Sequence, residues 1–129
     1  MRFSWCTLLV KDMDESLRFY QDVLGLEVDS RFSAMPGLEI AFLKTGETQL
    51  ELVKNAGSQS VAAGDAVSWG FQVDSLDDAL AMIREKDIPI YSGPFIDPTV
   101  KYFFIQDPNG LKIQLKQIIE SPPSPPIKV

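Results

Sequence analysis

Residues 10–17 have the sequence VKDMDESL, and residues 73–80 have the sequence VDSLDDAL. Each octet begins with the valine that ends an apolar run and continues with a residue that can cap a helix, followed by acidic residues suited to a first helical turn. The octets start at residues 10 and 73, an offset of 63, and the same offset aligns Leu50-Glu51-Leu52 with Ile113-Gln114-Leu115. One offset that serves two separate sites without a gap indicates an internal duplication.

Outward from the first octet, the pattern predicts one strand, one helix and three further strands. Asp12 is the expected N-cap of the helix and Gly25 its stop. Thr45-Gly46-Glu47 is expected to form a hairpin turn between the last two strands of this module. The predicted elements are a strand at 3–10, a helix at 12–24, and strands at 26–34, 38–44 and 47–54.

The second octet lies in an equivalent order of predicted elements: one strand, one helix and three further strands. Ser75 is the expected cap of its helix, and Asp107-Pro108-Asn109-Gly110 is a strong turn between its last two strands. The predicted elements are a strand at 66–73, a helix at 75–86, and strands at 88–91, 100–106 and 111–118.

The chain therefore belongs to the α+β class and consists of two tandem βαβββ modules. We expect module one at 1–54, a small polar linker at 55–65 and module two at 66–120, within one domain that spans 1–120. One face of each sheet is covered by a helix and the other needs a partner. Pairing of the modules predicts an eight-stranded, partly closed sheet around a cavity. The tail 121–129, SPPSPPIKV from Ser121, is expected to be extended.

Composition excludes several functions. A net charge of −6 disfavours nucleic acids and anionic membranes as partners. The chain contains no histidine, which excludes mechanisms that need an imidazole. A single cysteine, Cys6, allows no intrachain disulfide, and the broken apolar run at the N-terminus is typical of a strand rather than a signal peptide. These features predict a cytoplasmic protein.

Two longer motifs resemble a known family. Residues 12–26, DMDESLRFYQDVLGL, are similar to the opening signature of the vicinal oxygen chelate superfamily, which includes glyoxalases, bleomycin-resistance proteins and extradiol dioxygenases. Residues 107–115, DPNGLKIQL, are similar to its closing hairpin, and residues 70–74 fit its middle strand. The resemblance covers residues 1 to about 118 and implies the two-module fold.

The resemblance also implies where the metal ligands of the family's enzymes would lie. Those positions are occupied here by Trp5, Glu51, Ser68 and Gln114. An indole cannot coordinate a metal, and a serine hydroxyl is a poor neutral ligand. We therefore expect a degenerate site with no metal and no cofactor, whose four residues would instead bind a ligand.

Each of these residues has a plainer interpretation as well. Trp5 could be ordinary core, Glu51 a solvated glutamate on an outer face, and Gln114 a surface amide, while Ser68 could be small filler. The alignment with ligand positions favours the inner face for Trp5 and Glu51.

Three functions remain in competition. The favoured one is a protein that binds a small, flat, cationic or aromatic molecule without a metal. The alternative is a lyase or isomerase resembling lactoylglutathione lyase, with Glu51 as general base. The third is a structural or regulatory module whose cavity is filled by its own side chains. Whether the chain is an enzyme stays open at this point, and the family habit of pairing sheets across a two-fold axis predicts a homodimer.

Overall fold

The computed structural model describes residues 1–57 and 62–119, and its contacts divide the chain into two units. The first unit contains Met1–Val67 and, from much later in the sequence, Asp107–Leu111. The second contains Ser68–Gln106 and continues from Lys112. The predicted tail at 121–129 and the centre of the predicted linker lie outside the described residues.

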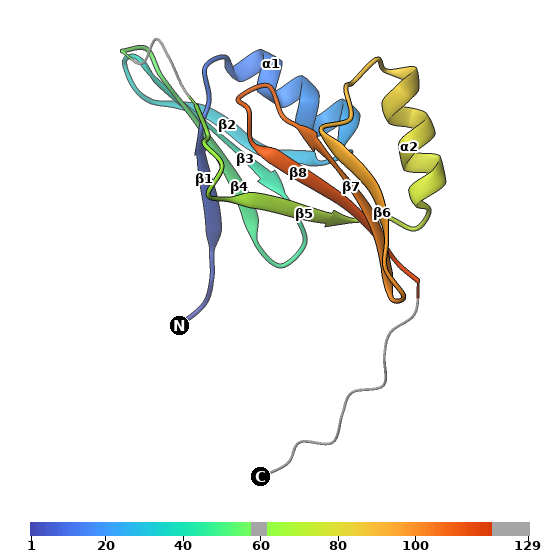
Figure 1. Ribbon diagram of the computed structural model, residues 1–129. Coiled ribbons are helices and arrows are strands. Elements are labelled where there is room, and N and C mark those ends of the chain that lie inside the picture. Colours follow the sequence, from blue (N-terminus) through green and yellow to red (C-terminus); the bar gives the residue numbers. More distant parts are fainter. Residues whose placement is uncertain (58–61, 120–129) are drawn as a thin grey trace. The chain divides into compact units, whose positions relative to one another are not determined.

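The first unit is a four-stranded sheet with one helical segment, coloured blue to green in Figure 1. Its strand order is β1-β4-β3-β2, in which β1 runs parallel to β4 and the other neighbours are antiparallel. The elements are β1 (Trp5–Leu9), α1 (Met13–Arg18), a π-helical segment η1 (Phe19–Val23), β2 (Glu27–Met35), β3 (Leu38–Lys44) and β4 (Gln49–Asn55).

The second unit repeats this arrangement, coloured from green to red in Figure 1. Its strand order is β5-β8-β7-β6, again with one parallel pair, β5 with β8. The elements are β5 (Ser68–Gln72), α2 (Leu76–Glu85), β6 (Ser92–Ile96), β7 (Val100–Gln106) and β8 (Lys112–Ile118).

The duplication predicted from the sequence is therefore confirmed, and with it the α+β class and the two βαβββ modules. Strands β1 and β5 begin at residues 5 and 68, and β4 and β8 at residues 49 and 112, so both pairs keep the offset of 63. The third strands begin at residues 38 and 100, an offset of 62. The loops on either side of this strand absorb the one-residue difference.

Both predicted helix starts are confirmed by their caps. The Asp12 side chain accepts a hydrogen bond from the Glu15 backbone N–H at 2.8 Å, and the Ser75 hydroxyl accepts one from the Asp78 N–H at 3.1 Å. Each cap satisfies a backbone donor that has no partner inside the helix. None of the helices in the described part of the chain is both long and apolar enough to cross a membrane.

The helix predicted at 12–24 is α-helical only in its first half. From Phe19 to Val23 it continues as a π-helix, and the Leu24 N–H reaches back five residues to the Phe19 carbonyl oxygen. Gly25, with φ of 70°, then ends the segment as expected. Amphipathic spacing could not separate the two forms because apolar residues recur similarly in both.

The strand predicted at 88–91 is wrong, because β6 is Ser92–Ile96. The Ile88 N–H instead bonds to the carbonyl oxygen of Ile83 at 3.1 Å and so closes the end of α2. Gly93 and Pro94 resemble turn residues in the sequence but lie within the strand. This is possible because β6 is at the edge of its sheet, where a proline costs no ladder hydrogen bond on its outer side.

In the first unit a buried polar network joins η1 to the turn that begins at Asp107. The Tyr20 hydroxyl donates to Asp107 Oδ2 at 2.7 Å, and the Asn109 and Leu111 N–H groups both donate to Oδ1 at 2.8 Å. Asn109 in turn donates to the Ser16 hydroxyl on α1 at 3.1 Å. Burial and the neighbouring carboxylate raise the pKa of the Tyr20 phenol far above its ordinary value. The network fixes this turn in the first unit although it follows β7 in the sequence.

Alternation along the strands gives each sheet one buried face. In the first unit this face carries Ala41, Leu43, Leu50 and Leu52, and α1 contacts β4. In the second unit it carries Phe103, Ile105, Ile113 and Leu115, and α2 contacts β8. Leu50 and Leu52 are thus buried on the face of their sheet that α1 contacts.

Candidate functional site

The face of the first sheet opposite its buried core carries two of the four residues predicted for the site, Trp5 and Glu51. Residues that pair across strands share a face, and those two apart on a strand do so as well. Thr7 pairs with Glu51, and Glu51 pairs with Phe42, which in turn pairs with Ser30. We call this the open face of the first sheet; it consists of Trp5, Thr7, Leu9, Ser30, Phe32, Ile40, Phe42, Gln49, Glu51 and Val53.

Glu51 lies at the centre of the open face. Its neighbours along β4, Leu50 and Leu52, are buried on the other side at 3% and 0% exposure, while Glu51 is half-buried. The Thr7 hydroxyl donates to Glu51 Oε1 at 2.7 Å. Within the described residues Oε2 has no hydrogen-bond partner. The carboxylate is therefore held by one oxygen and offers the other as an acceptor.

An aromatic cluster borders this carboxylate. The Trp5 ring meets the Phe42 ring edge-on, with centroids 5.5 Å apart, and Phe32 stacks on Phe42 at 6.4 Å. Trp5 remains 49% exposed and Phe32 44% exposed. Both are far more exposed than core aromatics, so core packing does not explain Trp5. The cluster presents ring surface beside a negative charge.

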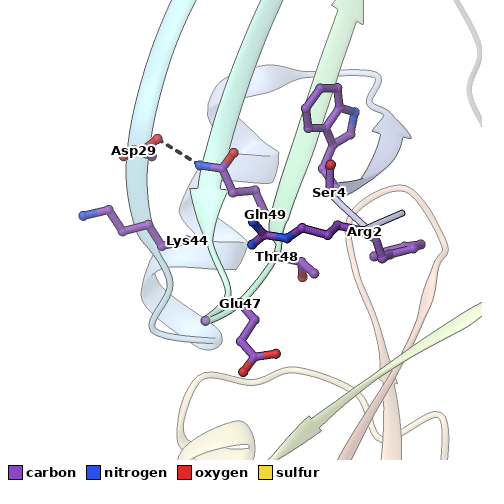
Figure 2. A pocket seen from close by; sticks show the side chains of 10 residues that line it. Arg2, Ser4, Asp29, Lys44, Glu47, Thr48 and Gln49 are labelled. Atoms are coloured by element: carbon purple, nitrogen blue, oxygen red, sulfur yellow. Dashed lines mark hydrogen bonds between the residues drawn. The ribbon is translucent and has the colours of Figure 1, made fainter.

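A pocket opens at the end of the face where β1 and β4 begin, with a volume of about 610 Å³. Figure 2 shows its polar lining, including the hydrogen bond from Gln49 Nε2 to Asp29 Oδ2 at 2.9 Å. Trp5 and Gln49 belong to both the pocket and the open face. Two basic and two acidic side chains balance in charge around it: Arg2, Lys44, Asp29 and Glu47.

Ser68 and Gln114 lie on the corresponding face of the second sheet. Gly70, two residues after Ser68 on β5, pairs with Gln114 on β8. A Cβ at Gly70 would come within 3.2 Å of the Gln114 side-chain oxygen, so the glycine makes room for the amide. Aromatic rings line this face too, with Tyr102 5.3 Å from Phe95 and 5.9 Å from Phe104. The face has an amide where the first sheet has a carboxylate.

The structure thus brings Trp5 and Glu51 together on one face of the first sheet and places Ser68 with Gln114 on the second sheet. Sequence reasoning missed Thr7 and the aromatic partners Phe32 and Phe42. Alternation could have found Thr7, since it lies two residues after Trp5 on the same strand. Phe42 needed the strand register, which the sequence did not supply.

Comparison with known proteins identifies the family to which the chain belongs. The sequence model of the Glyoxalase/Bleomycin resistance protein/Dioxygenase superfamily matches residues 2–115. The glyoxalase I of Leishmania major, a solved structure described as trypanothione-dependent, superposes with a TM-score of 0.77 at 27% identity, over 89% of this chain and 85% of that one. A glyoxalase I mutant from Zea mays gives a TM-score of 0.80 over 94% of this chain and 47% of its own, at 24% identity.

Two curated relatives align with this chain over most of their length. The lactoylglutathione lyase of Salmonella typhimurium is 32% identical over 124 residues, covering 89% of this chain and 91% of the relative. That of Neisseria meningitidis serogroup A is 30% identical over 125 residues, covering 91% of each. The chain belongs to the glyoxalase/bleomycin resistance/dioxygenase superfamily.

The residues that the family resemblance places at metal positions, Trp5, Glu51, Ser68 and Gln114, do not fit a divalent ion. The Trp5 indole has no lone pair in the ring plane to donate, and Ser68 and Gln114 would each offer only a neutral oxygen. Glu51, the one charged donor, already holds a hydrogen bond on Oε1. In residues 1–57 and 62–119 no three or more His, Cys, Asp or Glu side chains are grouped to hold a metal. The expectation of a metal-free protein stays a prediction.

Proposed function

We propose that this chain is a binding protein that takes a small aromatic cation on the open face of the first sheet, without a metal. The observation that carries the proposal is the half-buried Glu51 carboxylate beside exposed rings. Thr7 donates to one of its oxygens, and the other accepts no hydrogen bond from residues 1–57 or 62–119. A carboxylate in such a setting favours a positively charged or hydrogen-bond-donating partner.

The aromatic cluster supports the same class of ligand. The faces of Trp and Phe rings carry negative potential and attract cations as well as flat apolar groups. Trp5 leaves about half of its surface to solvent, at 49% exposure, which is the surface a ligand would cover. The net charge of −6 adds a general attraction for cations.

Calorimetric titration with a defined probe tests the proposal. The probe is N,N-dimethyl-(2-naphthyl)methylammonium, which combines a flat ring with one charged N–H donor. Glu51→Gln keeps the shape of the side chain and removes its charge, and should weaken binding by about 1–3 kcal/mol, the range for losing a charge-assisted hydrogen bond. Glu85→Gln, the same change at the exposed end of α2, is the matched control and should leave affinity unchanged. Equal affinity of wild type and Glu51→Gln would overturn the proposal.

A second candidate is favoured by the comparisons. Relatives at 30–32% identity, aligned over nearly their full length, are lactoylglutathione lyases. Under this candidate Glu51 would act as the general base on a glutathione hemithioacetal. The assay is isomerisation of the methylglyoxal–glutathione hemithioacetal with and without added divalent ions. Enzyme-like turnover that Glu51→Gln abolishes would replace binding by catalysis as the function.

A further inference from the structure

The hydrogen bond between Thr7 and Glu51 has a consequence for which ligands the open face accepts. The Thr7 hydroxyl lies 2.7 Å from Glu51 Oε1, and the pair is in direct register on the parallel strands β1 and β4. Both backbones are therefore fixed by ladder hydrogen bonds, and the two side chains meet without moving either strand.

A flat ligand that covers Trp5 and Phe42 would also remove water from the Glu51 carboxylate, because Glu51 lies on β4, the strand between β1 and β3. Each carboxylate oxygen that loses water without gaining a donor then carries a desolvation cost. Thr7 supplies the donor for Oε1 in advance. A ligand therefore needs to satisfy Oε2 alone, and one N–H group is enough.

We propose that Thr7 is a specificity-determining residue of this face, which tunes Glu51 to cationic ligands with a single N–H donor and against forked cations such as amidinium. An amidinium presents two parallel N–H donors that match both oxygens of a free carboxylate. Here Oε1 already accepts a hydrogen bond from Thr7, so the second donor of the fork gains less at this oxygen than it would at an unpaired one. The inference rests on the proposed binding function and adds the donor pattern of the ligand.

The second unit gives an internal comparison. The position equivalent to Thr7 is Gly70, and the position equivalent to Glu51 is Gln114, as the paired registers show. The hydroxyl and the carboxylate thus occur together in one module and are both missing from the other. This agrees with their acting as a pair.

The test compares two ring-matched probes, the single-donor N,N-dimethyl-(2-naphthyl)methylammonium and the forked 2-naphthamidinium. Thr7→Val keeps the shape of the side chain and removes the hydroxyl, while Thr7→Ser keeps the hydroxyl. We expect Thr7→Val to lower affinity for the single-donor probe about tenfold, with a much smaller loss for the amidinium, because the fork can satisfy the freed Oε1. Thr7→Ser should retain the wild-type ratio of the two affinities.

Glu51→Gln separates the possible failures. If it weakens both probes while Thr7→Val leaves their affinity ratio at the wild-type value, the role of Thr7 is overturned and the proposed function stands. If it weakens neither probe, or if wild type binds neither, the proposed function fails and this inference with it. A purely structural role for Thr7 would lower both affinities by the same factor, and that result also overturns the inference. Circular dichroism and the thermal midpoint of each variant establish that it is folded.

Discussion

At the level of single residues, the open face of the first sheet is distinguished by the neighbours of the Glu51 carboxylate. The Thr7 hydroxyl donates to one oxygen of Glu51, and the Trp5 and Phe42 rings lie on the same face of the sheet. The same residue could serve a binding protein or a lyase, and only the experiments on Glu51 distinguish them.

Trp5→Ala tests the aromatic half of the site. Removing the indole deletes both ring surface and cation–π attraction, so affinity for the dimethylammonium probe should fall by about 0.5–2 kcal/mol. Ile96→Ala is the control, since Ile96 is a still more exposed apolar side chain, at 77%, on a different sheet. Calorimetry on the two variants measures the difference, and unchanged binding by Trp5→Ala would exclude the ring from the site.

Tyr20→Phe tests the buried network. The variant loses the hydroxyl that donates to Asp107 at 2.7 Å, and we expect it to be less stable than wild type by about 1–3 kcal/mol at pH 8, measured by urea unfolding. Tyr91→Phe, at a ring that is 49% exposed, should have little effect. A loss no larger than that of the control would show that the network adds nothing to stability.

The same variant has a distinct pH dependence. Burial and Asp107 raise the pKa of the Tyr20 phenol, so the folded state keeps its proton while the unfolded state loses it above the ordinary value of 10.0. The stability that Tyr20 contributes is complete below that value and falls as the pH rises through it. The advantage of wild type over Tyr20→Phe should therefore shrink by about 1.4 kcal/mol between pH 8 and pH 11. A constant difference across this range would contradict the account.

At the scale of elements, the helix caps were predictable because their chemistry is local. Asp12 satisfies the Glu15 N–H within four residues of sequence. Asp12→Ala should destabilise the protein by about 1 kcal/mol, whereas Asp12→Asn, which keeps an acceptor oxygen, should cost much less. Thermal unfolding of the two variants compares them, and equal losses would mean that charge rather than capping explains the effect.

The strands differ in how well their bounds could be predicted from the sequence. Strands β3 and β7 were predicted to the residue because alternation and flanking turn residues are both strong there. The predicted position of β6 was wrong because the Ile88 N–H bonds to a carbonyl oxygen at the end of α2 and not to a neighbouring strand. The pattern of apolar residues in the sequence does not reveal such a backbone hydrogen bond. The pairing of Thr7 with Glu51 was also out of reach, since it joins residues 44 apart through a register that only the folded sheet defines.

At the scale of the whole molecule, one βαβββ plan occurs twice and has diverged at the site. Both open faces keep aromatic rings at equivalent positions, Phe42 and Phe104, each paired with the residue at the family's ligand position, Glu51 or Gln114. Only the first module keeps a carboxylate there. The duplication supplied the scaffold, and individual substitutions distinguish its two halves.

The oligomeric state is a prediction of the family resemblance. We expect a homodimer at micromolar concentration, measured by size-exclusion chromatography with light scattering. The monomer mass is 14.4 kDa, so a dimer would be resolved easily. A mass that stays at the monomer value across a hundredfold range of concentration would refute this expectation.

We expect ligand binding on the open face to be independent of metal ions. The most direct measurement is calorimetric titration of the dimethylammonium probe into chelator-treated protein, repeated after addition of zinc or nickel. Since neither Trp5 nor Ser68 can supply a strong metal ligand, we expect the same affinity before and after the metal is added. Binding that appears only with the metal would contradict it.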